Sequence, residues 1–280
     1  MKQPGPIERR LVGAFVRRVF WGNRRGKPWD VPAHLEHDSV RFAGNSGATL
    51  AGRYFPHPAP KGVVVLAHPD RRYGSHWFVR EGWVEWLLRN GFEVLTFDFA
   101  PFGASRGGST YLHEDVLGAV AFARRWSGGQ PVHVIGLSIG AFATVNASPH
   151  LDVDSLVLES PYPTFNAWYG RGWGKWAMAL FDRLFPRTAN VIQAHRNIAN
   201  ARAPRILVAA SPTDDVTPAR LSRIVFDAAP ARARWLDVPG TKHLGLFADA
   251  GYRAAVLATL EGRPTDREAL RPVLPTPDAR

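Results

Sequence analysis

Residues 133–143, HVIGLSIGAFA, place Ser138 between two glycines in a G-x-S-x-G pattern. This spacing is typical of a nucleophilic serine held in a sharp turn between a strand and a helix. A chain of this composition contains roughly 0.1 such matches by chance, so the pattern needs independent support. Because a serine hydroxyl is a weak nucleophile at neutral pH, a histidine and a carboxylate must come from elsewhere in the chain.

Two later turns supply these partners. The segment RILVAASPTDDVTP places Asp214 and Asp215 directly after an apolar run that is typical of a strand. The segment WLDVPGTKHLGLF places His243 after the next such run. Functional groups of parallel sheets collect at the carboxyl ends of the strands. We therefore expect Ser138, His243 and one of the two aspartates to meet there, in the chain order serine, aspartate, histidine.

Strand-like and helix-like segments alternate along most of the chain. Residues 62–67, GVVVLA, are a continuous apolar run, as in a strand buried on both faces. This alternation with short links predicts an α/β fold with a mostly parallel, twisted sheet and helices on both faces. Strands are expected at 39–42, 49–55, 62–67, 92–97, 132–135, 155–158, 205–210 and 234–238, and helices at 77–90, 113–126, 139–147, 218–228 and 244–260.

Residues 162–203 interrupt this alternation and are too long for a plain loop. The segment is rich in aromatic residues, and we interpret it as a short helical cap inserted over one end of the sheet. Trp168, Trp173 and Trp176 are its candidates for lining an apolar substrate pocket. Packing of the aromatic side chains against the sheet explains their presence equally well.

The composition excludes several kinds of chemistry. The chain has no cysteine, so disulfides, cysteine-ligated zinc and thiol catalysis are excluded. Its ten histidines include no H-x-x-x-H pair, and we expect neither a metal nor an organic cofactor.

The N-terminal residues 1–30 form a basic arm. They hold eight Lys or Arg and two acids, more than half of the net charge of +11. The longest apolar run, residues 11–16, is too short for a signal peptide or a membrane span. The apolar residues of the arm share one helical face. This pattern has two interpretations. The helix packs on the domain, or residues 7–21 lie on an anionic membrane surface.

The rest of the chain carries little net charge, so we expect no nucleic-acid partner. Residues 31–262 are expected to form the main domain, and residues 263–280 a proline-rich C-terminal tail. We expect a cytoplasmic protein, with the arm as its route to a membrane. The oligomeric state is left open.

Together these segments resemble the α/β-hydrolase superfamily, most closely its serine aminopeptidase-like and acylglycerol-lipase-like branch. The resemblance covers about residues 39–262 and rests on VVVLAHPD, FDFAPFGASRGG, GLSIGA, LESPY, ILVAASPTDDVTP and VPGTKHLGLF. It implies the α/β-hydrolase fold. The family's G-x-x-D-x-x-V-P turn aligns with residues 211–218 and implies Asp214 as the acid. It also implies structural roles for His68 and Asp98.

Acyl transfer also needs hydrogen-bond donors for the developing oxyanion. The N–H of Ile139, directly after the serine, is one expected donor. Where the family usually has His-Gly-x, this chain has His68, Pro69 and Asp70, and proline has no N–H. Alignment with the family makes the Asp70 N–H the second donor, with the Asp70 carboxylate turned away, toward Arg71 or Arg72.

The expected function is that of a serine hydrolase acting on an ester or related acyl bond of a small, hydrophobic acyl substrate. An acyltransferase or a thioesterase would use the same three residues. A non-catalytic binding protein of the same fold is a further alternative.

Overall fold

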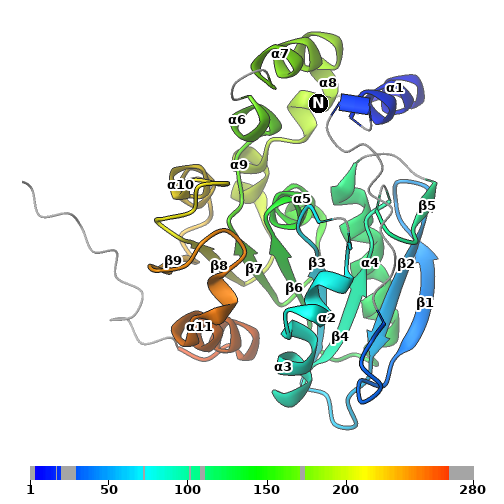
Figure 1. Cartoon of the computed structure of the whole chain (residues 1–280), viewed down its shortest axis with the longest axis vertical. Helices are drawn as coiled ribbons and strands as arrows, with labels where there is room; N and C mark the ends of the chain where they lie inside the picture. Colours follow the sequence, from blue (N-terminus) through cyan, green and yellow to red (C-terminus); the bar gives the residue numbers. More distant parts are fainter. Residues whose placement is uncertain are drawn as a thin grey trace, which may run out of the picture.

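The computed structural model describes residues 4–16, 18–19, 30–71, 73–100, 102–107, 111–170 and 174–264. A nine-stranded sheet in order β1-β2-β4-β3-β6-β7-β8-β9, with β5 beside β2, forms the centre of this described part (Figure 1). The strands are β1 (Asp38–Ala43), β2 (Ala48–Phe55), β3 (Val63–Ala67), β4 (Glu93–Phe97), β5 (Arg106–Gly107), β6 (Val132–Leu137), β7 (Ser155–Glu159), β8 (Arg205–Ala210) and β9 (Ala233–Asp237). Pairing is parallel from β4 to β9 and antiparallel around β2.

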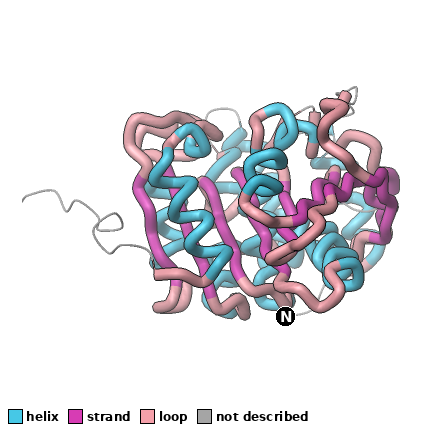
Figure 2. Tube along the Cα trace, turned by 90° about the horizontal axis from the view of Figure 1, so that it is seen from below, coloured by secondary structure: helices cyan, strands magenta, loops and turns pink. Residues whose placement is uncertain are grey.

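Helices cover both faces of this sheet (Figure 2). One face is covered by α4 (Leu112–Trp126), α5 (Ile139–Ala147) and α10 (Ala219–Asp227). The other is covered by α2 (His76–Arg80), α3 (Trp83–Arg89) and α11 (Ala250–Glu261). The central strands β3, β6 and β7 are buried along their whole length, which explains their mostly apolar sequences. The predicted fold class is confirmed.

The segment that interrupts the alternation is helical. It contains α6 (Phe165–Tyr169), α7 (Gly174–Leu184), α8 (Pro186–Val191) and α9 (Ala194–Asn197), which lie above one end of the sheet (Figure 1). Short 3-10 helices occur at η2 (Ser148–His150), η3 (Ile198–Asn200) and η4 (Leu246–Ala248).

The N-terminal helix α1 (Pro6–Val16) packs against the cap and α4. The ring of Phe15 lies 5.7 Å from that of Phe181 in α7. The carboxylate of Glu8 accepts hydrogen bonds from the N–H and hydroxyl of Thr188 in α8. The described part of the arm therefore packs on the domain. Most of the proline-rich tail expected over residues 263–280 lies outside the described residues.

Three sequence predictions were wrong in detail. The helix expected over 77–90 is two helices, because Gly82 takes a left-handed conformation (φ 79°) between α2 and α3. The helix expected over 244–260 begins at 250, where the Asp249 side chain caps it by accepting the N–H of Tyr252. A histidine at the start of the helix predicted over 113–126 is expected at the surface, but His113 is partly buried and lines a cavity.

The packing of α4 on the turn after β1 generates a prediction. A Cβ at Gly118 would lie 2.6 Å from the carbonyl oxygen of Ala43 and 2.7 Å from the Cα of Gly44. We expect Gly118→Ala to lower the free energy of unfolding by about 1–3 kcal/mol, because the added methyl group overpacks two backbones. Urea unfolding measures this, with Ala121→Ser on the exposed side of α4 as control. Equal stability of Gly118→Ala and the parent chain would contradict the packing described.

Candidate active site

Ser138 occupies a strained turn between β6 and α5. Its φ of 54° and ψ of −113° are unusual for a residue with a side chain. Its N–H donates to the carbonyl of Glu159 at 2.8 Å. A Cβ at Gly140 would lie 2.0 Å from the carbonyl oxygen of Ala67, and one at Gly136 would lie 2.7 Å from that of Gly140. Both glycines of the G-x-S-x-G pattern are therefore required by close backbone packing.

The structure brings Ser138, His243 and Asp214 into one hydrogen-bonded chain. His243 Nε2 lies 3.1 Å from Ser138 Oγ, and His243 Nδ1 lies 2.8 Å from Asp214 Oδ2. Ser138 and Asp214 are buried, each with 4% of its surface exposed, whereas Asp215 is exposed. The alternative carboxylate, Asp215, is thus turned to solvent.

The carboxylate of Asp214 is held by several donors. Its Oδ1 accepts the backbone N–H of Val216 at 2.9 Å and of Thr217 at 2.7 Å. Its Oδ2 also accepts the hydroxyl of Ser160 at 3.0 Å. Burial acts to raise the pKa of Asp214, but His243 and these donors outweigh it, so the pKa lies below its usual value. Asp214 is therefore ionised and able to stabilise a charged imidazole.

The loops that carry Asp214 and His243 are tied to each other. The carbonyl of Thr241 accepts the hydroxyl of Ser211 at 2.5 Å and that of Thr213 at 2.6 Å. The family's turn has glycine at the position of Ser211, so this chain uses the substituted side chain as a link between the two loops.

The loop after β3 has a fixed shape around His68. The carbonyl of Pro69 lies 2.8 Å from Nδ1 of His68, and Nε2 of His68 accepts the N–H of Phe99 at 3.1 Å. His68 Nδ1 is therefore the protonated nitrogen and donates to that carbonyl. Burial lowers the pKa of His68, in keeping with a neutral ring. These contacts give His68 a structural position, away from the hydrogen-bonded chain of Ser138.

The two candidate oxyanion donors lie at the ends of neighbouring strands. Ile139 is the first residue of α5, so its N–H has no acceptor within the helix and lies at the positive end of the helix dipole. Asp70 follows β3, which pairs with β6. The carboxylate of Asp70 is near enough to Tyr162 to add to the rise that burial causes in the pKa of that hydroxyl. Arg72, one expected partner of Asp70, lies outside the described residues.

Asp98 holds two loops together. Its Oδ1 accepts the N–H and the hydroxyl of Ser75, both at 2.8 Å, and its Oδ2 accepts the N–H of Ala104 at 2.9 Å. A Cβ at Gly103 would lie 2.0 Å from Asp98 Oδ2. The contacts of Asp98 are thus those of a structural residue.

The three tryptophan candidates have different positions. Trp168 stacks on Tyr162 with ring centres 5.6 Å apart, and its Nε1 donates to the hydroxyl of Thr217 beside the acid. Trp176 is 81% exposed, so it does not line an enclosed pocket in this structure. Trp173 lies outside the described residues. Phe142, which the sequence reasoning missed, stacks on Tyr162 at 4.6 Å; its place four residues after the serine was the available signal.

Glu159 is a second residue that sequence reasoning missed. It ends β7, where it pairs with the residue before the serine, and its side chain is fully buried. Burial raises the pKa of Glu159 to about 8; the Tyr252 hydroxyl opposes this shift, and the charge of Asp214 adds to it. Glu159 is thus largely neutral at pH 7, which avoids a second negative charge behind Asp214. An acid at the end of an apolar strand, in LESPY, was the sequence signal.

Comparison with known proteins places this chain in a family. Residues 58–190 match the family described as serine aminopeptidase, S33. The uncharacterised protein Rv2307c of Mycobacterium tuberculosis is 30% identical over 204 residues, which cover 70% of this chain and 69% of that protein. The chain belongs to the α/β-hydrolase superfamily, in its S33 branch. It is an α/β-hydrolase-type enzyme, as the sequence resemblance implied.

Further similarities support the fold of this α/β-hydrolase. The uncharacterised protein YfhR of Escherichia coli is 22% identical over 239 residues, which cover 79% of this chain and 76% of YfhR. The esterase Pf2001 of Pyrococcus furiosus superimposes with a TM-score of 0.68 at 17% identity, over 85% of this chain and 98% of the esterase. Within the described residues, no helix has the length and apolar character needed to cross a bilayer, and no group of three potential ligands could hold a metal ion.

The buried carboxyl of Glu159 predicts a dependence of stability on pH. Because its pKa in the folded protein exceeds its ordinary value of 4.5, its stabilising contribution is complete below about pH 4.5 and is lost as pH rises through about 8. We expect Glu159→Gln to flatten this decline, since an amide does not ionise. Urea unfolding at intervals from pH 4.5 to 8.5 measures it. The exposed Glu81→Gln serves as control, and an unchanged slope in Glu159→Gln would refute the assignment.

Proposed function

We propose that this α/β-hydrolase cleaves an ester or related acyl bond through Ser138, His243 and Asp214. The supporting observation is the hydrogen-bonded chain of 3.1 Å and 2.8 Å that joins the three side chains. His243 Nε2 takes the proton of Ser138 Oγ as that oxygen attacks the substrate carbonyl. Asp214 accepts the Nδ1–H of His243, fixes its tautomer and stabilises the imidazolium.

The remaining steps follow from the same groups. The N–H groups of Ile139 and Asp70 would stabilise the tetrahedral oxyanion. The imidazolium of His243 then gives its proton to the leaving group, and an acyl ester on Ser138 remains. Water, deprotonated by His243, attacks this ester, and the imidazolium of His243 gives that proton to Ser138 Oγ as the acyl group leaves as the carboxylic acid.

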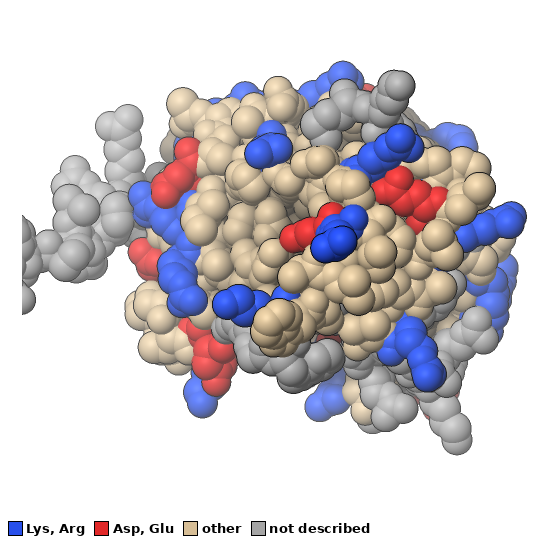
Figure 3. Space-filling view, turned by 90° about the horizontal axis from the view of Figure 1, so that it is seen from above, with Lys and Arg blue, Asp and Glu red and all other residues tan. Residues whose placement is uncertain are grey.

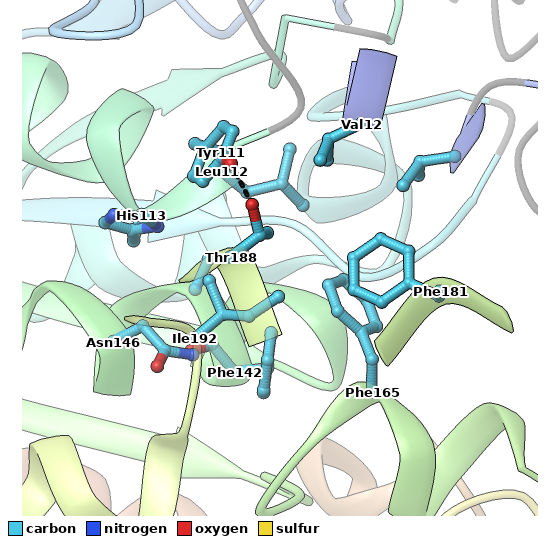
Figure 4. A pocket seen from close by; sticks show the side chains of 12 residues that line it. Val12, Tyr111, Leu112, His113, Phe142, Asn146, Phe165, Phe181, Thr188 and Ile192 are labelled. Atoms are coloured by element: carbon cyan, nitrogen blue, oxygen red, sulfur yellow. Dashed lines mark hydrogen bonds between the residues drawn. The ribbon is translucent and has the colours of Figure 1, made fainter. Parts of the chain in front are cut away.

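A small apolar cavity under the cap supports the proposal of a hydrophobic acyl substrate, although none of the three proposed catalytic residues lines it. It is bounded by α1, α4, α5 and the cap, and Figure 4 shows its apolar side chains around a hydrogen bond between Tyr111 and Thr188. Phe142 contributes to the lining, and its N–H donates to the carbonyl of Ser138, so the cavity shares a helix with the nucleophile. Its volume of about 20 Å³ holds about one water molecule, so an alkyl chain would enter only if α1 or the cap moves; the apolar walls would then suit that chain better than a sugar or a phosphate ester.

Substitution of the proposed nucleophile tests the mechanism. Ser138→Ala should reduce kcat for p-nitrophenyl esters by at least roughly 10⁴-fold, because no other group can form the acyl-enzyme. It should also abolish labelling by a fluorophosphonate probe. Ser148→Ala, at the other end of α5, is the matched control and should keep both properties. Undiminished turnover by Ser138→Ala, or a parent protein that the probe does not label, would sink the proposal and favour a non-catalytic binding protein.

The acyl-enzyme can be resolved by nucleophiles other than water. Acyltransferase and thioesterase activities use the same three residues and remain alternatives within this proposal. A series of acyl esters and thioesters of increasing chain length, assayed with and without an added alcohol, separates them. Free acid as the sole product identifies hydrolysis, and an ester of the added alcohol identifies acyl transfer.

We also propose that α1 and α7 contact an anionic membrane surface. Ile7 and Leu11 of α1 are 75% and 55% exposed. On α7, Trp176, Leu180 and Leu184 recur at intervals of four residues and are 81%, 47% and 53% exposed. Figure 3 shows mostly neutral side chains on the side of α7, with Lys and Arg around them. Exposed basic residues in or next to these two helices are Arg10, Arg18, Lys175, Arg183 and Arg187, a combination that suits anionic lipid.

Flotation with vesicles tests this surface. The parent protein should float with vesicles that contain phosphatidylglycerol and remain in solution with pure phosphatidylcholine. The double substitution Trp176→Ser and Leu180→Ser should lower the floated fraction several-fold, whereas Ile224→Ser, an exposed apolar residue of α10, should not. Equal flotation of the double variant and the parent would refute the membrane contact.

A further inference from the structure

A second pocket, of about 550 Å³, lies on the antiparallel side of the sheet and contains none of the three residues of the proposed active site. Its floor is one face of β1, β2 and β5. Thr49, Ala51 and Arg53 alternate along β2 and so share this face. Arg106 pairs with Thr49, and Arg41 pairs with Ala51. The strand register therefore gathers three arginines in one pocket.

Two side chains deep in the pocket, Arg53 and His76, have hydrogen-bond donors without an acceptor among the described residues. Arg53 Nη1 lies 2.6 Å from Nε2 of His76, a residue with 4% of its surface exposed. Burial lowers the pKa of His76 to about 4, so the ring is neutral and accepts from Arg53 through Nε2. Its Nδ1–H and the Nε–H of Arg53 are buried without an acceptor anywhere in the described chain. Buried donors of this kind are normally satisfied, by water or a ligand if not by protein.

The charge in the pocket is also unbalanced. Its lining holds three arginines and a single carboxylate, Asp98, whose oxygens already accept three hydrogen bonds from the chain. The charge of the exposed Asp30 also reaches His76. The segments before residue 265 that the structure does not describe contain no Asp or Glu. The undescribed segments within residues 1–264 therefore add no carboxylate that could balance the positive charge of the pocket.

We propose that this pocket binds the phosphate group of a small ligand. Guanidinium groups present parallel donors that match phosphate oxygens, and the two excess positive charges match a phosphate dianion. Arg106 is held in place at the pocket because its Nη1 donates to the carbonyls of Gly103 and Ser105. The buried His76 Nδ1–H supplies a further donor. The volume of the pocket leaves room for the organic part of a phosphate monoester.

Calorimetric titration of the full chain with inorganic phosphate at low ionic strength tests this inference. Arg41 and Arg106 are exposed, so the double substitution Arg41→Gln and Arg106→Gln should leave the fold intact. It should raise the Kd for phosphate at least tenfold. Arg125→Gln, an exposed arginine of α4, is the matched control and should leave the Kd unchanged.

Further measurements distinguish a soluble phosphate ester from a lipid headgroup. They also distinguish failure of phosphate binding from failure of the proposed hydrolase activity. Glycerol 1-phosphate that binds more tightly than phosphate identifies a soluble ester, and preference for phosphatidate vesicles identifies a lipid headgroup. Ser138→Ala should bind phosphate as the parent does, so a failed hydrolase proposal does not affect this result. Absence of saturable binding to both phosphate and phosphatidate, or an unchanged Kd in the double variant, would overturn the inference.

Discussion

The close approach of two backbones behind Ser138 is the constraint on which the rest of the site depends. The first turn of α5 lies against the carbonyl of Ala67, so closely that Gly140 has no room for a side chain. The same contact brings the end of β3 beside the start of α5. The strained turn at Ser138 and the loop that carries Asp70 are therefore positioned by a single packing interaction between neighbouring parallel strands.

The other half of the site depends on links between loops. The backbone carbonyl of Thr241 joins the acid loop to the histidine loop through two hydroxyl groups. Trp168 extends this network to the cap through its hydrogen bond to Thr217, whose N–H also binds Asp214. The carboxylate, the imidazole and the cap are thus coupled, and a change in the cap reaches the acid through two hydrogen bonds.

Local patterns were sufficient to predict most of the sheet and the positions of Ser138 and His243, because buried parallel strands have mostly apolar sequences. The choice of Asp214 over Asp215 needed the resemblance to a known family. The helix boundaries at Gly82 and Asp249 were missed, since the first depends on a left-handed backbone and the second on one capping side chain. The neutral state of Glu159 was also missed. It arises from burial between elements distant in the sequence, which no local pattern reports.

The N-terminal helix has a consequence for the order in which the molecule assembles. Glu8 bonds to Thr188, 180 residues later, and Val12 helps to line the apolar cavity. Because Thr188 lies in the cap, α1 completes its contacts only once the cap has formed. Transient release of α1, a terminal helix, would open the cavity to apolar molecules while the sheet and the turn that carries Ser138 stay folded.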